Sequence, residues 1–156
     1  SGAAGKSNKT GGAGGGLVWM RVRRSAIIDG TLTANGTVAA EWTCGDGSGG
    51  GIFLDCDDLS GTGSITANGG MIGGSNGGAH GGGGRIAVWE GVPDVYRTRF
   101  LSGNFSAAII TNEPPYAFTG TATASCGAVG HVSQRAMPGT VVFLTSPPLG
   151  SLLIVR

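Results

Sequence analysis

The sequence predicts an all-β fold: a parallel β-helix (β-solenoid) with about four rungs of 33–34 residues and glycine-rich arcs. Three observations predict this fold. Glycine, which supplies 33 of the 156 residues, recurs in runs before strand-like segments. These segments follow one another at a fixed spacing, and one face of each is apolar. Because one repeat cannot bury its apolar face alone, the stacked repeats are expected to form the core.

The first strand of each repeat follows a glycine run. A shift of 34 residues superimposes "GGGLVWMRV" on "SGGGIFLDC", and a second shift of 34 reaches "GGGRIAVWE". On one face this alignment places Val18, Ile52 and Ile86 in a single column. Such period-two alternation predicts a strand with one face on a core, stacked ~4.8 Å from the next copy.

The second strand of the repeat lies after a short turn. A shift of 33 superimposes "TLTANG" (31–36) on "SITANGG" (64–70), with a looser echo in "LSGNFSAAI" (101–109). Leu32 over Ile65 forms its apolar column. The repeat unit is therefore strand, turn, strand and glycine-rich arc, in which glycine permits close approach between neighbouring backbones.

The outer face of the second strand carries small polar residues. Thr33 lies over Thr66, and Asn35 over Asn68 is interpreted as an amide ladder along the stack. Regular Thr-x-Thr arrays can match an ordered water lattice, so ice binding is a further alternative function.

A fourth copy, "GTVVFLT" followed by "GSLLIV", is expected after an irregular insertion at 91–138. Residues 1–156 are predicted to form a single solenoid module. Because the last strand-like run reaches the end of the sequence, the module is expected to be a piece of a larger protein.

The outer face of the first strand is aromatic. Trp19 lies over Phe53, and Trp89 lies beside them, which predicts a binding surface or interface. Two interpretations remain open. The segment "NEPPYAF" (112–118) could fold over the aromatic residues, or they could face another polypeptide or a sugar ring.

Charge excludes some functions. Ten lysine and arginine residues oppose nine acidic residues, so no basic field is present to attract nucleic acid. No apolar run approaches the ~20 residues that cross a bilayer, so membrane insertion is not expected.

Arg21 over Asp55 is interpreted as an ion pair between rungs with little energetic weight.

The cysteines leave two possibilities open. Cys44 and Cys56 lie twelve residues apart across one glycine arc and are candidates for a disulfide. The alternative is that all three cysteines, including Cys126, are small buried side chains.

Three Asn-x-Ser/Thr sequons begin at Asn8, Asn35 and Asn104, and they are candidate N-glycosylation sites. Asn35 is a poor acceptor if its amide belongs to a ladder. The sequons and cysteines together favour an extracellular, secreted or cell-surface glycoprotein.

No catalytic residues, metal ligands or cofactors are expected. Glycoside hydrolysis needs two carboxylates facing each other across a groove, whereas the acidic residues here are mostly isolated. Asp55 and Asp57 share a face and Asp58 points away, so calcium is not expected. His80 and His131 are interpreted as solvated turn residues.

The repeat pattern, "LSGTGSITANGG" with "GGGGRIAVW" and "GTVVFLT", resembles the glycine-rich parallel β-helix repeats of large secreted or cell-surface adhesin-like proteins. The resemblance covers nearly the whole chain except 91–138. It implies an extracellular structural or adhesive role without catalysis, in a fibre or surface layer.

Copies of the chain or neighbouring modules are the predicted partners, stacked end to end through open rung ends. Glycans are a second candidate partner. The alternative function is therefore a carbohydrate-binding or polysaccharide-cleaving β-helix module with the aromatic face as its platform.

Overall fold

The structure is a computed structural model, and it describes residues 9–41, 43–71, 79–103, 109–111, 114–127 and 136–145. Strands dominate and most of them pair in parallel, which confirms the predicted all-β class. Among the described residues no helix has the length and apolar character needed to cross a membrane.

The strands form three sheets. Sheet A has the order β1 (Leu17–Arg21), β4 (Gly51–Cys56), β7 (Arg85–Glu90), β10 (Thr140–Thr145) and β8 (Ile109–Thr111). Sheet B pairs β2 (Ser25–Ile27) with β5 (Asp58–Ser60). Sheet C contains β3 (Thr31–Thr33), β6 (Ser64–Thr66) and β9 (Thr121–Thr123).

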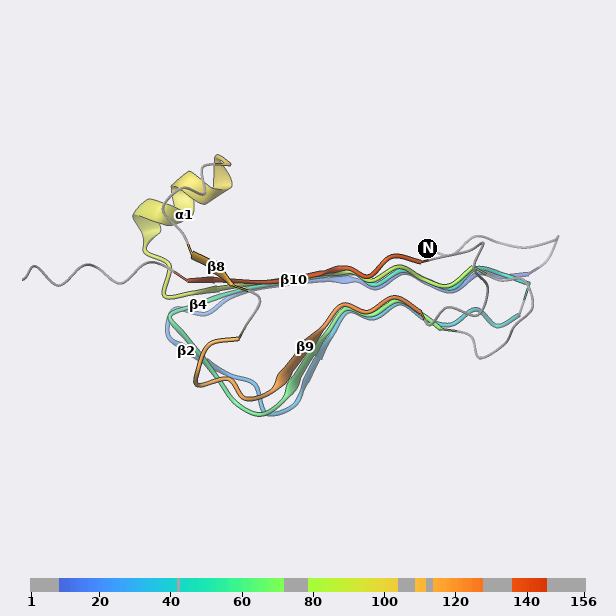
Figure 1. Ribbon diagram of the computed structural model, residues 1–156, viewed down its shortest axis with the longest axis horizontal. Coiled ribbons are helices and arrows are strands. Elements are labelled where there is room, and N and C mark those ends of the chain that lie inside the picture. Colours follow the sequence, from blue (N-terminus) through green and yellow to red (C-terminus); the bar gives the residue numbers. More distant parts are fainter. Residues whose placement is uncertain are drawn as a thin grey trace, which may run out of the picture.

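The predicted register of the first strand is confirmed. Val18 pairs with Ile52, Ile52 with Ile86, and Ile86 with Val141. Ile52 and Ile86 are buried, whereas Val18 at the end of the column is only partly covered. The apolar side chains of each pass of the chain are therefore covered by those of the neighbouring passes in the same column. Figure 1 shows the passes lying over one another along sheet A.

One apolar core lies between the three sheets. Leu54 comes from sheet A, Leu59 from sheet B and Ile65 from sheet C, and all three side chains are fully buried. The predicted columns of the second strand are confirmed too, since Leu32 pairs with Ile65.

Beyond this core the chain forms a slab that we call the glycine slab. One layer consists of residues 12–16, 46–50, 81–84 and 137–139, and the other of 34–37, 67–70 and 124–127. Backbone hydrogen bonds join the layers: the N–H groups of Gly50 and Gly84 donate to the carbonyl groups of Ala34 and Ala67 at 2.8 and 2.7 Å. No side-chain core is needed where backbones bond directly.

Glycine is required in the slab because neighbouring passes lie so close together. A Cβ atom on Gly50 would overlap the carbonyl oxygen of Gly16 in the preceding pass. This contact supports the sequence-based explanation of the glycine runs.

The described residues of the range 91–138 contain three regular elements: α1 (Asp94–Leu101), β8 and β9. The looser echo proposed for 101–109 is wrong, because β9 supplies the third strand of sheet C and pairs with β6. β8 instead pairs antiparallel with β10 and occupies that edge of sheet A. Helix α1 projects from the end of sheet A, as Figure 1 shows.

Candidate interaction surface

The outer face of sheet A carries the predicted aromatic residues in contact with one another. The ring centroids of Trp19 and Phe53 lie 4.5 Å apart, and those of Phe53 and Trp89 lie 5.1 Å apart with the rings nearly perpendicular. The register places Trp19 opposite Phe53, and Asp55 opposite Trp89, as predicted. Trp19 is 64% exposed, so it is the accessible end of this aromatic row.

Helix α1 and the turn before it cover the other end of the row. Trp89 and Tyr96 pack against the buried side chains of Val92 and Leu144. Within 114–118, the described part of the segment 112–118, neither Tyr116 nor Phe118 provides this cover. Phe118 is buried in the core at 2% exposure, and Tyr116 is fully exposed.

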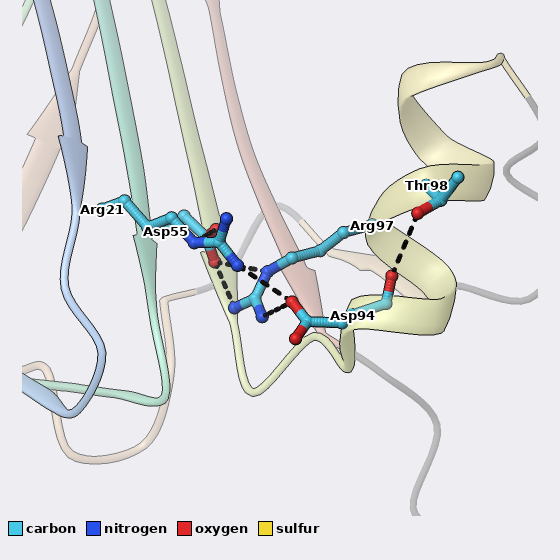
Figure 2. A network of polar contacts seen from close by, with 5 residues as sticks. All are labelled: Arg21, Asp55, Asp94, Arg97 and Thr98. Carbon is cyan, nitrogen blue, oxygen red and sulfur yellow. Dashed lines mark hydrogen bonds and ion pairs between the residues drawn. The ribbon is translucent and has the colours of Figure 1, made fainter.

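A network of charged side chains anchors α1 to sheet A (Figure 2). Arg97 Nε and Nη2 donate to Asp55 Oδ1 at 3.1 and 2.6 Å. Arg21 Nε lies 3.4 Å from Asp55 Oδ2. Asp94 Oδ1 accepts from Arg21 Nη2 and from Arg97 Nη1, each at 2.9 Å.

The predicted Arg21–Asp55 pair is present, and Asp55 has a second partner, Arg97, that the sequence did not indicate. Asp55 is only 3% exposed, and Arg97 supplies its shorter contacts. A buried carboxylate that loses its partners is strongly destabilising, so Arg97 is a structural residue. Sequence reasoning missed this residue because it lies 42 positions from Asp55 and outside the repeat.

Nearby ionisable groups respond to this environment. Hydrogen bonding from Arg97 lowers the pKa of Asp94 below its usual range. Burial raises the pKa of Glu90, although its Oε1 accepts a hydrogen bond from the Leu59 N–H. Burial, with neighbouring carboxylates, raises the pKa of the Cys56 thiol to about 12, so this thiol stays protonated.

An open polar cleft of about 390 Å³ lies between α1 and the end of β1. Its lining is Arg21, Val22, Arg23, Asp57, Asp94 and Arg97. Guanidinium and carboxylate groups offer both donors and acceptors for a polar ligand. Trp19 is two residues from Arg21 on the same strand face, so the exposed end of the aromatic row lies beside a residue that lines the cleft.

The outer face of sheet C forms ladders between successive strands. Asn68 N–H donates to Asn35 Oδ1 at 2.7 Å, and Ser125 N–H donates to Asn68 Oδ1 at 2.8 Å, so the asparagine side chains bond along the stack as predicted, but to backbone N–H groups of the next strand rather than to another amide side chain. The Thr66 hydroxyl donates to Thr33 at 3.1 Å. The Ser64 hydroxyl likewise donates to Thr31 at 3.2 Å, so the hydroxyl groups also bond along the stack.

The candidate Cys44–Cys56 disulfide is not formed, and the alternative of small buried side chains holds for these two cysteines. Both side chains are buried, and Cys56 is a free thiol. Residues 46–56 run beside residues 79–90 as an extended segment. Such a segment spans on the order of 30 Å, far beyond the reach of a disulfide.

One of the three sequons, at Asn35, begins in the described part of the chain. The Asn35 amide oxygen serves the ladder. Asn8 and Asn104 lie outside the described residues, as does His131.

His80 is not the solvated turn residue that the sequence suggested. Its side chain is 8% exposed, and Nδ1 lies 3.3 Å from Asp46 Oδ2. Asp46 Oδ1 also accepts a hydrogen bond from Ala39 N–H at 2.8 Å. The two residues are 34 positions apart, so the repeat spacing was the signal that could have paired them.

Within the part of the chain that the structure describes, no group of three or more histidine, cysteine, aspartate or glutamate residues is arranged to hold a metal ion. Comparison with family models, curated proteins and solved structures gave no match to this chain.

Proposed function

We propose that the chain is a β-solenoid module, a parallel β-helix with about four rungs, that serves an extracellular structural or adhesive role. In this role it forms or decorates a fibre or a cell-surface layer and performs no catalysis. The resemblance to glycine-rich repeats of adhesin-like proteins points the same way.

The observation that carries the proposal is the register between successive passes. Val18, Ile52 and Ile86 occupy one column at intervals of 34 residues, and Leu32 lies over Ile65 at an interval of 33. A molecule built by stacking similar passes presents long, regular faces, which suits a scaffold. The glycine slab adds a second stacked region held by backbone hydrogen bonds.

The location can be tested on intact cells of the organism that makes the protein. Antibodies against the folded chain should label the cell surface or secreted material, and external protease should remove the label. Labelling that appears only after permeabilisation, and that external protease leaves intact, would overturn the extracellular role.

A second candidate function, carbohydrate binding, is favoured by the exposed indole of Trp19 beside the polar cleft. A glycan array tests it. Trp19→Ala should abolish any binding, Trp89→Ala should weaken it, and Tyr116→Ala should leave it unchanged because Tyr116 is an exposed aromatic residue elsewhere. The absence of any bound glycan would exclude this function.

A further inference from the structure

β1 is one of the two edge strands of sheet A, and β8 is the other. Among the described strands, none pairs with the side of β1 opposite β4. The Gly16 carbonyl and the Val22 N–H bond to β4, so the hydrogen-bonding groups of even-numbered residues face β4. In an alternating strand, the groups of Leu17, Trp19 and Arg21 therefore point to the unpaired edge. An edge that presents such groups can accept another strand.

Apolar side chains are exposed along the same edge. Leu17 is 72% exposed, and Met20, which shares a column with the buried Leu54, is 37% exposed. Val18 belongs to the core but is only partly covered. The edge therefore needs an occupant that brings both backbone groups and an apolar face.

The opposite edge of sheet A is the short strand β8, which offers only three residues to such an occupant. β8 pairs antiparallel with Phe143, Leu144 and Thr145 of β10. Head-to-tail stacking would have to displace β8 so that β1 could pair with β10, or pair the five-residue β1 with the three-residue β8.

The face of the glycine slab that the first pass forms does not fit a further parallel pass stacked on it. A Cβ atom on Gly47 would overlap the Ala13 carbonyl of the preceding pass, and one on Gly70 would overlap the Thr37 carbonyl. Ala13 and Thr37 hold these positions in the first pass, and both are exposed. Their side chains fill the space that the carbonyl groups of a further parallel pass would occupy.

We propose that β1 pairs antiparallel with β1 of a second copy of this chain, across a two-fold axis at Trp19. This inference rests on the proposed structural function and names its partner. Trp19 of each copy would exchange two backbone hydrogen bonds with its equivalent, and Val18 would lie opposite the partner's Met20. The glycine slabs would point in opposite directions, so Ala13 and Thr37 stay uncovered.

This arrangement is isologous and closes at two copies, which separates it from open stacking. Sedimentation velocity over a wide concentration range should show monomer and dimer only. A monomer at every concentration would overturn the pairing, and so would oligomers that keep growing with concentration. Neither result bears on the cell-surface location, which the labelling experiment decides separately.

A matched pair of variants tests the backbone contact. Trp19→Pro removes the outward N–H and should weaken dimerisation at least about tenfold relative to Trp19→Thr, which loses the same indole but keeps the N–H. Equal dimerisation constants for the two variants would overturn the proposed pairing.

Cross-linking gives a readout that does not depend on proline being tolerated. In Cys126→Ser protein, Trp19→Cys should form a disulfide-linked dimer on mild oxidation, because hydrogen-bonded antiparallel pairs have Cα atoms ~5.5 Å apart. Thr33→Cys, on the exposed face of sheet C, is the control and should stay monomeric under denaturing conditions. Equal cross-linking of the two variants, or none at Trp19→Cys, would contradict the symmetry.

Discussion

Asp55 decides how α1 is held. Its carboxylate is buried at the meeting point of β4 and α1 and accepts hydrogen bonds from Arg97, while Arg21 lies nearby. The burial of this charge is tolerated because two guanidinium groups surround it. The residue belongs to the repeat, whereas its main partner comes from outside it.

The substitution Asp55→Asn should lower the free energy of unfolding by about 3 kcal/mol, because it removes the buried charge to which Arg97 donates two hydrogen bonds and leaves Arg97 only the exposed carboxylate of Asp94. Chemical denaturation measures this loss. Asp57→Asn, an exposed aspartate two residues along, is the control and should change stability by less than about 0.5 kcal/mol. Similar losses in both variants would show that Asp55 is not specifically required.

Glu90 predicts a pH dependence of stability. Burial raises the pKa of Glu90 in the folded protein, so its ionised form is disfavoured there. Its contribution is fully present below the unfolded pKa of ~4.3 and is lost as pH rises through the higher folded pKa. Glu90→Gln keeps an oxygen for the Leu59 N–H and should remove this loss.

Thermal melts of the wild type and Glu90→Gln between pH 4 and pH 7 measure the effect. The variant should gain stability relative to the wild type as pH rises. The contribution of Asp94 to stability depends on pH in the opposite direction. Arg97 lowers the pKa of Asp94, so this contribution is lost only as the pH falls into the more acidic range. A stability difference that stays constant across this range would contradict the assignment.

At the scale of elements, the glycine slab shows how segments with few side chains pack. Successive passes are fixed by hydrogen bonds between backbone groups, and glycine lets those groups approach. Gly16 and Gly50 occupy equivalent positions in the first and second passes, 34 residues apart. Only Gly50 lies against a preceding pass in the structure, whereas Gly16 has open space around its Cβ position.

Because only one of these two equivalent glycines is crowded, the same substitution should affect stability differently at the two positions. Gly50→Ala should destabilise the protein by about 3 kcal/mol, since the added methyl group would overlap the Gly16 carbonyl. Gly16→Ala should cost less than about 0.5 kcal/mol. Denaturant titration of the two variants compares them, and equal stability would show that the slab can separate at no cost.

At the scale of the whole molecule, the two ends of the stacked sheets are finished differently. β8 occupies one edge of sheet A, and Phe118, which forms an isolated bridge with Gly61, inserts its side chain into the core. At the other end β1 keeps exposed apolar residues. The molecule therefore has a direction, and its two ends do not match each other.

Phe118→Ala should lower the free energy of unfolding by about 3–5 kcal/mol, because it leaves a cavity inside the core. Tyr116→Ala is a control in the same turn and should be almost neutral, since the Tyr116 side chain is fully exposed. Thermal denaturation of both variants decides whether Phe118 closes the core. Two equally stable variants would exclude that role.

The sequence by itself determined the register of the repeated strands, the apolar columns, the aromatic row and the asparagine ladder. Each depends on residues 33 or 34 positions apart, so a shift of the sequence places them together. Residues Val18, Trp19 and Asn35 could be assigned to faces because strands alternate and parallel passes repeat that alternation.

Only the tertiary structure decided where the inserted elements go. Arg97 reaches Asp55, Phe118 enters the core, β8 reverses direction and β9 completes sheet C. These elements lie outside the repeat, so no internal copy indicates their partners. Their positions follow from which buried charge, open core end or strand edge each can satisfy, and those sites exist only once the repeated passes have stacked.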